Sequence, residues 1–125
     1  AAAIAAHTLP MAPFYDLLSA FEQDVSTTRY ADFGEVVAYC RRSANPVGRL
    51  MLALLGEHDA QSLAMSDGIC TALQLINFLQ DVEQDWARGR VYLPQADLAR
   101  FKVSEQQIAQ LTTAAVTAVN AAPRS

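Results

Sequence analysis

The sequence predicts an all-α domain whose helices pack roughly antiparallel through short connections. Apolar residues recur at helical spacing along most of the chain, and no stretch alternates as a strand would. Apolar residues make up 52% of the chain and charged residues 18%, which excludes a disordered tail. A length of 125 residues fits one domain or a piece of one.

The first part of the chain predicts two helices. Residues 14–25 keep helical spacing, and Pro13 stands where a first helical turn tolerates proline. Asp32 and Glu35 resemble a capping pair that opens a second helix.

A break is expected after this second helix. Asn45-Pro46 should interrupt it, and helical spacing then resumes over residues 47–55 until Gly56. The longest helix is expected over residues 59–87, since no proline intervenes.

The chain after this long helix predicts smaller elements. Residues 91–94 form a short extended stretch, followed by a short helical piece. Ser104 and Gln107 form the pattern of a capping box for a last helix. The alanine-rich stretch over residues 1–6 specifies no element strongly.

The longest helix carries a polar stripe on an otherwise apolar surface. Its members fall on one face at 100° per residue: Gln74, Asn77, Asp81 and Asp85, with Asp67 and Thr71 extending the stripe upstream. We expect this helix to be buried on most sides, and buried acidic groups need compensation. A divalent cation would compensate Asp81 and Asp85, and two carboxylates at this spacing suit Mg²⁺. Arg88, Arg90 and Tyr92 follow directly and could supply donors to an anion. The alternative is a solvated acidic face without function, which is common for this spacing.

Charge and composition exclude several other classes. A net charge of −4 and a pI near 4.9 argue against nucleic-acid binding. No apolar run is expected to span a membrane, and the first residues lack the basic start of a signal peptide. Cys40 and Cys70 are expected to be core residues, and Phe78 and Trp86 are more simply core than cavity lining. His7 and His58 have no partner at ligand spacing.

Two separated segments resemble the squalene/phytoene synthase family. Residues 74–94, QLINFLQDVEQDWARGRVYLP, are similar to its second aspartate-rich motif. Residues 39–48, YCRRSANPVG, with YADF at residues 30–33, are similar to the helix that faces this motif. The SANPVG variant is most similar to the bacterial hydroxysqualene synthase branch of hopanoid biosynthesis.

The resemblance implies an isoprenoid synthase fold, of which residues 1–125 would be a central fragment, a partial helical bundle of one domain. It implies Mg²⁺-assisted ionisation of farnesyl or presqualene diphosphate to a carbocation, which water quenches to hydroxysqualene, so that no NADPH is expected. The implied metal ligands are Asp81 and Asp85; the implied catalytic residues are Tyr39, Asn77, Arg90 and Tyr92; the implied substrate-binding residues are Ala44, Val47, Gly48, Gln74 and Asn77. The expected location is the cytoplasm, with peripheral contact at the inner face of the membrane.

The sequence departs from the family pattern in two respects. Many relatives have arginine where this chain has Gln80, and residues 1–13 contain no carboxylate of a first aspartate-rich motif. Squalene or phytoene synthase activity is therefore kept as an alternative. A non-catalytic helical interaction module derived from the family is a second alternative.

Overall fold

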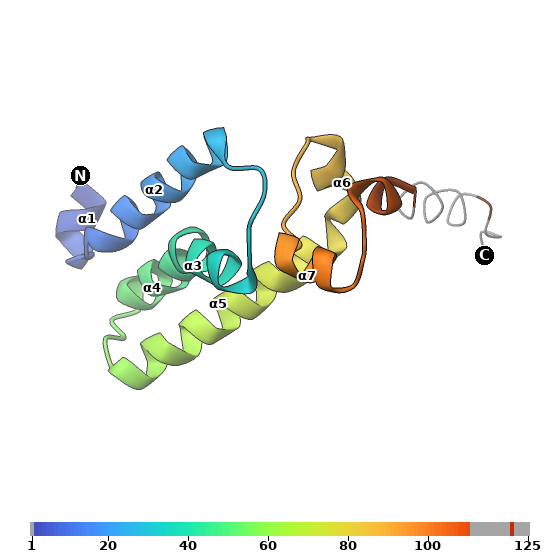
Figure 1. Cartoon of the computed structure of the whole chain (residues 1–125). Helices are drawn as coiled ribbons and strands as arrows, with labels where there is room; N and C mark the ends of the chain where they lie inside the picture. Colours follow the sequence, from blue (N-terminus) through green and yellow to red (C-terminus); the bar gives the residue numbers. More distant parts are fainter. Residues whose placement is uncertain (1, 111–120, 122–125) are drawn as a thin grey trace.

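The computed structural model describes residues 2–110 and residue 121, and its elements are helices (Figure 1). They are α1 (Ala2–His7), α2 (Ala12–Ser26), α3 (Phe33–Ser43), α4 (Asn45–Leu54), α5 (Ala60–Gln80), α6 (Val82–Ala87) and α7 (Gln95–Arg100). Residues 105–110 are helical as well. The described residues contain no strand beyond one isolated parallel bridge between Arg29 and Val91. The all-α prediction is confirmed.

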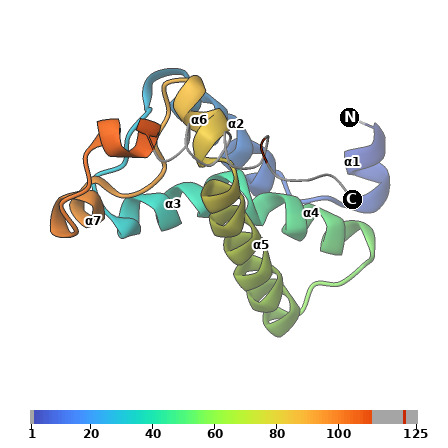
Figure 2. The same ribbon diagram turned by 90° about the vertical axis from the view of Figure 1, so that its right-hand side faces the viewer.

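The helices form a layered arrangement with α3 and α4 in the middle. These two helices follow one another almost in line (Figure 2). α2 packs against one side of them and α5 against the other. α6 and α7 lie at the carboxyl end of α5 (Figure 1). The residues that carry the sequence motifs therefore come from the middle layer, from α5 and α6, and from the segments before α3 and after α6.

The helix starts follow the capping patterns of the sequence. The Glu35 backbone N–H donates to the Asp32 carboxylate over 2.9 Å at the start of α3. Pro13 lies in the first turn of α2, where its missing N–H costs no hydrogen bond. Ser104 and Gln107 exchange side-chain to backbone hydrogen bonds of 2.8 and 3.2 Å. The capping box of the last helix is thus confirmed.

The break between α3 and α4 falls at Ala44, next to the predicted Asn45-Pro46. The Ala44 N–H still donates to the Cys40 carbonyl over 2.9 Å, but its φ of −113° leaves the helical range. Pro46 has no N–H with which to continue the ladder, and it is fully buried in the first turn of α4.

The single helix predicted over residues 59–87 is wrong in one place. α5 ends at Gln80, and the chain turns at Asp81, whose φ and ψ are −98° and 12°, before α6 begins. The turns on either side belong to different cores, because Phe78 packs in one cluster and Val82 packs against another. Hydrophobic periodicity cannot reveal this, since both turns keep helical spacing.

Two small cores hold the elements together. The first core joins α2, α3 and α5. Its aromatic rings, which we term the tyrosine cluster, are Tyr30, Tyr39, Phe78 and Tyr92. Cys40 is fully buried beside it, and burial raises the pKa of its thiol to about 11. The distal core consists of Val91, Leu98 and Ile108, with Val82 and Trp86 packed against it. The core roles predicted for Cys40, Phe78 and Trp86 are confirmed, whereas Cys70 is only half-buried.

The apolar circumference of α5 is far more exposed than expected. Phe78 is the one buried residue of this helix, and Ile69, Ile76 and Leu79 are 58%, 47% and 65% exposed. The expectation of a helix buried on most sides is therefore wrong among the described residues. The expectation that no segment could span a membrane is also wrong by length and composition, since the 21 residues of α5 reach a mean hydropathy of 1.2. This is a weak indication, because a core helix of a soluble protein meets the same criterion.

Gly48 allows α4 and α5 to cross closely. A Cβ atom at this position would lie 2.3 Å from the Ser66 hydroxyl and 2.7 Å from the Cys70 sulfur. Both distances are far inside van der Waals contact, so any side chain would push the two helices apart or displace two neighbours at once.

Gly48→Ala should therefore lower the free energy of unfolding by about 1–3 kcal/mol, the usual cost of overpacking. Gly68→Ala is the matched control, because a Cβ atom at that helical position meets nothing within 4 Å. Gly68→Ala should instead stabilise α5 slightly through its better helix propensity. Denaturant unfolding of both variants measures the two changes, and a Gly48→Ala protein as stable as the parent would contradict this role.

Candidate functional site

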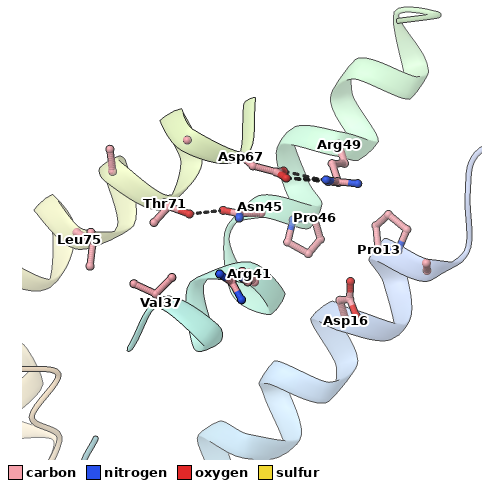
Figure 3. A pocket seen from close by; sticks show the side chains of 13 residues that line it. Pro13, Asp16, Val37, Arg41, Asn45, Pro46, Arg49, Asp67, Thr71 and Leu75 are labelled. Carbon is pink, nitrogen blue, oxygen red and sulfur yellow. Dashed lines mark hydrogen bonds and ion pairs between the residues drawn. The ribbon is translucent and has the colours of Figure 1, made fainter. Parts of the chain in front are cut away.

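The upstream end of the polar stripe on α5 is satisfied by α4. Arg49 contacts the Asp67 carboxylate with two nitrogens, Nε at 2.9 Å and a terminal nitrogen at 2.6 Å (Figure 3). The Thr71 hydroxyl donates to the Asn45 side-chain oxygen over 2.8 Å. Asp67 and Thr71 thus hold two helices together, and they are not free members of a candidate site.

The downstream end of the stripe has no such partner. The side chains of Gln74, Asn77, Asp81 and Asp85 make no hydrogen bond or ion pair with the part of the chain that the structure describes. Asn77 is exposed, and the other three are half-buried. The helix break at Asp81 does not separate the two acids. The Asp85 backbone N–H still donates to the Asp81 carbonyl over 2.8 Å, as in one turn of helix.

The two carboxylates affect each other electrostatically. Burial, and then the charge of Asp81, raises the pKa of Asp85 above its ordinary value, while Arg88 and Arg90 act in the opposite direction. The described residues hold no cluster of three or more His, Cys, Asp or Glu side chains that could bind a metal ion. Mg²⁺ commonly needs only one or two carboxylates, so Asp81 and Asp85 fit a magnesium ion whose other ligands come from water or phosphate.

Three further predicted residues meet beside this acidic end. Tyr92 stacks on Phe78 with ring centroids 4.1 Å apart, and its ring lies 6.1 Å from that of Tyr39. The Arg90 guanidinium lies against the Tyr92 hydroxyl, and this contact raises the pKa of Arg90. The backbone N–H of Arg90 donates to the backbone carbonyl of Asp85 over 2.8 Å. The structure thus brings Tyr39, Arg90 and Tyr92 together near Asp85.

Tyr39 is held as a neutral phenol in this arrangement. It is 5% exposed, and its hydroxyl donates to the Asp24 carboxylate over 2.6 Å. Burial first, and the Asp24 hydrogen bond second, raise the pKa of Tyr39. Burial also raises the pKa of the neighbouring Tyr30 to about 12.

The small residues predicted to bind substrate lie at the α4–α5 crossing. Ala44 occupies the break before α4, and Gly48 lies against Ser66 and Cys70. Val47 lies on the flank of α4 that points away from Arg49 and is 47% exposed. Only Val47 of these three thus presents a side chain at an open surface.

An apolar surface flanks the crossing on this side. It comprises Val47 and Met51 of α4 and Ile69 and Leu73 of α5, all of them exposed. These four residues, which we term the apolar wall, lie on the flanks of their helices away from Arg49 and Asp67. Asn77 continues the α5 flank one turn beyond Leu73. The apolar wall is therefore an exposed apolar surface on the flank opposite the Arg49–Asp67 pair.

A cavity lies on the other side of the crossing. It has a volume of about 620 Å³ and is lined by α2, α3, α4 and α5, including Asp16, Arg41 and the Arg49–Asp67 pair (Figure 3). None of the site residues predicted from the sequence lines it. The cavity and the candidate site are therefore separate features.

Arg29 and Glu105 fix the segment that carries Arg90, and sequence reasoning did not single them out. Arg29 donates to the Gly89 carbonyl over 2.7 Å and pairs with both Glu105 oxygens at 2.7 and 2.9 Å. The two residues are 76 positions apart, so no spacing rule connects them. Opposite charge alone would not have identified the pair.

The coupling between the two acids predicts a pH effect. Because folding raises the pKa of Asp85 above 3.8, the folded protein binds this proton more tightly than the unfolded chain. Stability should therefore fall as the pH rises from the ordinary pKa through the raised one. Asp81→Asn should lower the pKa of Asp85 and lessen this loss, as measured by NMR titration of the Asp85 carboxyl carbon.

Glu83→Gln is the matched control for that titration. Glu83 is exposed on the face of α6 opposite the stripe, so its removal should leave the Asp85 curve in place. An Asp85 titration that is unchanged by Asp81→Asn would show that the two carboxylates do not share a site.

Comparisons with known proteins agree with this geometry. The model of the family "Squalene/phytoene synthase" matches residues 1–122. Hydroxysqualene synthase of Rhodopseudomonas palustris is 45% identical over 106 residues, covering 82% of this chain and 36% of that protein. Hydroxysqualene synthase of Zymomonas mobilis is 40% identical over 113 residues, covering 81% of this chain and 37% of that protein. Phytoene synthase of Mycobacterium tuberculosis is 35% identical over 95 residues, covering 76% of this chain and 32% of that protein.

Two solved structures share the fold. Squalene synthase HpnC from Alicyclobacillus acidocaldarius matches with a TM-score of 0.80 at 43% identity, over 84% of this chain and 40% of that one. A dehydrosqualene synthase in complex with ligand matches with a TM-score of 0.75 at 32% identity, over 81% of this chain and 36% of that one. The chain thus spans about a third of the length of the relatives it matches. The predicted isoprenoid synthase fold and the resemblance of the two motifs are both confirmed, and the chain belongs to the squalene/phytoene synthase family.

Proposed function

We propose that the complete protein is a Mg²⁺-dependent synthase that ionises farnesyl or presqualene diphosphate and forms hydroxysqualene. The observation that supports this most is the acidic end of the stripe, where Asp81 and Asp85 make no hydrogen bond or ion pair with the described residues, together with the exposed apolar wall. A prenyl diphosphate has the same division into a highly charged end and a long apolar chain. The two parts of the surface therefore suit the two parts of one substrate.

Asp81 and Asp85 are the proposed ligands of the metal. They are oxygen ligands with no hydrogen bond or ion pair among the residues that the structure describes, and they remain partly accessible. Mg²⁺ bound there would screen the charge of the leaving diphosphate. Arg90 has five N–H donors, of which the described contacts use only a part, so it can also bind phosphate oxygens. Asn77 and Gln74 offer amide groups on the same stripe.

The apolar wall is the proposed contact for the prenyl chain. Val47, Met51, Ile69 and Leu73 are between 47% and 60% exposed. Covering them with an isoprenoid chain would gain roughly 25 cal/mol for each Å² of apolar surface removed from water. The substrate's chain would thus supply binding energy while its diphosphate is held at the acidic end.

The relatives support the choice of product. Proteins named hydroxysqualene synthase are 40–45% identical to this chain, whereas those named phytoene synthase are 34–39% identical. Quenching of the carbocation by water needs no hydride donor, so we propose no NADPH. We further propose action in the cytoplasm with peripheral contact at the inner face of the membrane, because substrate and product are apolar.

The second candidate is a squalene or phytoene synthase activity. The similarity to squalene synthase HpnC and to phytoene synthases favours keeping it. Analysis of the products formed from farnesyl and geranylgeranyl diphosphates separates the two candidates, since the product differs in carbon number and in the presence of a hydroxyl group.

Asp81→Ala combined with Asp85→Ala should abolish turnover in the protein expressed from its complete open reading frame. Loss of both ligands removes several kcal/mol of charge stabilisation, so we expect roughly a hundredfold or greater loss in kcat. Release of diphosphate from presqualene diphosphate in the presence of Mg²⁺ measures it.

Glu83→Ala serves as the control, since it removes an exposed acid of α6 that lies off the stripe. This variant should keep its activity. Undiminished turnover in the double variant would refute the roles of Asp81 and Asp85. A complete protein that is folded yet inactive on every prenyl diphosphate would instead favour a non-catalytic interaction module.

A further inference from the structure

Asp24 of α2 contacts both of the residues that the proposed site takes from distant parts of the chain. Its carboxylate accepts the hydroxyl proton of Tyr39 over 2.6 Å. Its main-chain carbonyl accepts a hydrogen bond from Arg90 over 2.6 Å, and another Arg90 nitrogen lies 3.8 Å from the carboxylate. Asp24 is thus bound through its side chain and through its backbone at once.

We propose that Asp24 is a positioning residue that fixes the Tyr39 phenol as a hydrogen-bond acceptor at the site and aims the Arg90 guanidinium at the diphosphate end of the substrate. The inference rests on the proposed function and extends it to a residue outside both sequence motifs. Asp24 itself is a positioning residue and not a catalytic one, because it acts through Tyr39 and Arg90.

The hydrogen bond with Asp24 decides what the Tyr39 hydroxyl can still do. A phenol has one proton, and an ionised carboxylate can only accept it. With that proton donated to Asp24, the Tyr39 oxygen is left with acceptor sites alone. The bond is short and charge-assisted, which fixes the orientation of the phenol more firmly than a neutral partner would.

The contacts with Asp24 also fix the direction of Arg90. Arg90 is 27% exposed, and its segment follows α6 in a turn that includes Gly89 at φ 75°. A guanidinium in such a turn would otherwise sample several rotamers, and the hydrogen bond to a helix carbonyl removes this freedom. The remaining N–H groups of Arg90 stay available for an anion.

A purely structural role makes different predictions. If Asp24 only joined α2 to α3, its replacement would change stability, and its effect on turnover would be independent of Tyr39. If it positions Tyr39, its effect on turnover should vanish once the Tyr39 hydroxyl is gone, because coupled residues are not additive.

The test is a double-mutant cycle in the protein expressed from its complete open reading frame, with presqualene diphosphate and Mg²⁺. Asp24→Asn should lower kcat by about tenfold to a hundredfold, the range expected for loss of a hydrogen bond to a charged group. Tyr39→Phe should lower kcat by a similar factor, and Asp24→Asn should have less than about a threefold further effect in the Tyr39→Phe background. Asp24→Glu keeps the carboxylate and should recover part of the activity.

Glu22→Gln is the matched control, because Glu22 is an exposed acid of the same helix with no hydrogen bond among the described residues. It should leave kcat unchanged. Wild-type kcat in Asp24→Asn, or losses that simply multiply in the double variant, would overturn the proposal.

A second readout does not depend on turnover. With 3-fluorotyrosine at position 39, the ¹⁹F resonance should move in Asp24→Asn and stay in place in Glu22→Gln, whatever the enzyme's activity. An unmoved resonance in Asp24→Asn would overturn the proposal even if activity fell. Absence of turnover in the wild type would overturn the proposed function alone, and the ¹⁹F shift would still decide whether Asp24 holds Tyr39.

Discussion

The close crossing of α4 and α5 at Gly48 is the constraint on which the rest of the structure depends. Because Gly48 has no side chain, the helices approach until Arg49 and Asn45 reach Asp67 and Thr71. The Thr71 hydroxyl gives the buried Asn45 side chain a partner, and a buried polar group without one would cost about 1–3 kcal/mol. The contacts with α4 involve Asp67 and Thr71, whereas Asp81 and Asp85 lie further along the stripe. The downstream acids therefore have no partner on α4, and none among the other residues in the described part of the chain.

The second part of the site is built by a return of the chain to the segment between α2 and α3. The segment after α6 is tied back by a hydrogen bond of 2.9 Å from the Val91 N–H to the Thr28 carbonyl, and by the contacts of Arg29 with Gly89 and Glu105. Tyr92 then stacks on Phe78 within the tyrosine cluster. This packing sets a cation and a phenol beside Asp85. The aromatic core is thus also the scaffold of the candidate site.

The sequence predicted the helices, the capping residues and the kink at Asn45-Pro46, since each depends on neighbours within a few residues. It did not predict the turn at Asp81, because that turn arises from two cores built by distant residues. Helical spacing placed Asp67 and Asp85 on one stripe, yet only the structure shows that Asp67 is paired with Arg49. Likewise no spacing rule joins Arg29 to Glu105, whose contact spans 76 positions. Local rules thus predicted the elements, and the assignment of partners needed the tertiary contacts.

The central claim is that the downstream acids of the stripe, Asp81 and Asp85, form one cation site, whereas the upstream Asp67 does not take part. Mn²⁺ in place of Mg²⁺, added with inorganic diphosphate to the protein expressed from its complete open reading frame, tests this directly through paramagnetic broadening of assigned NMR signals. The account predicts strong broadening at Asp81 and Asp85, weaker broadening at Arg90, and none at Asp67. Broadening centred on Asp67, or an equal effect at all exposed acids, would contradict it.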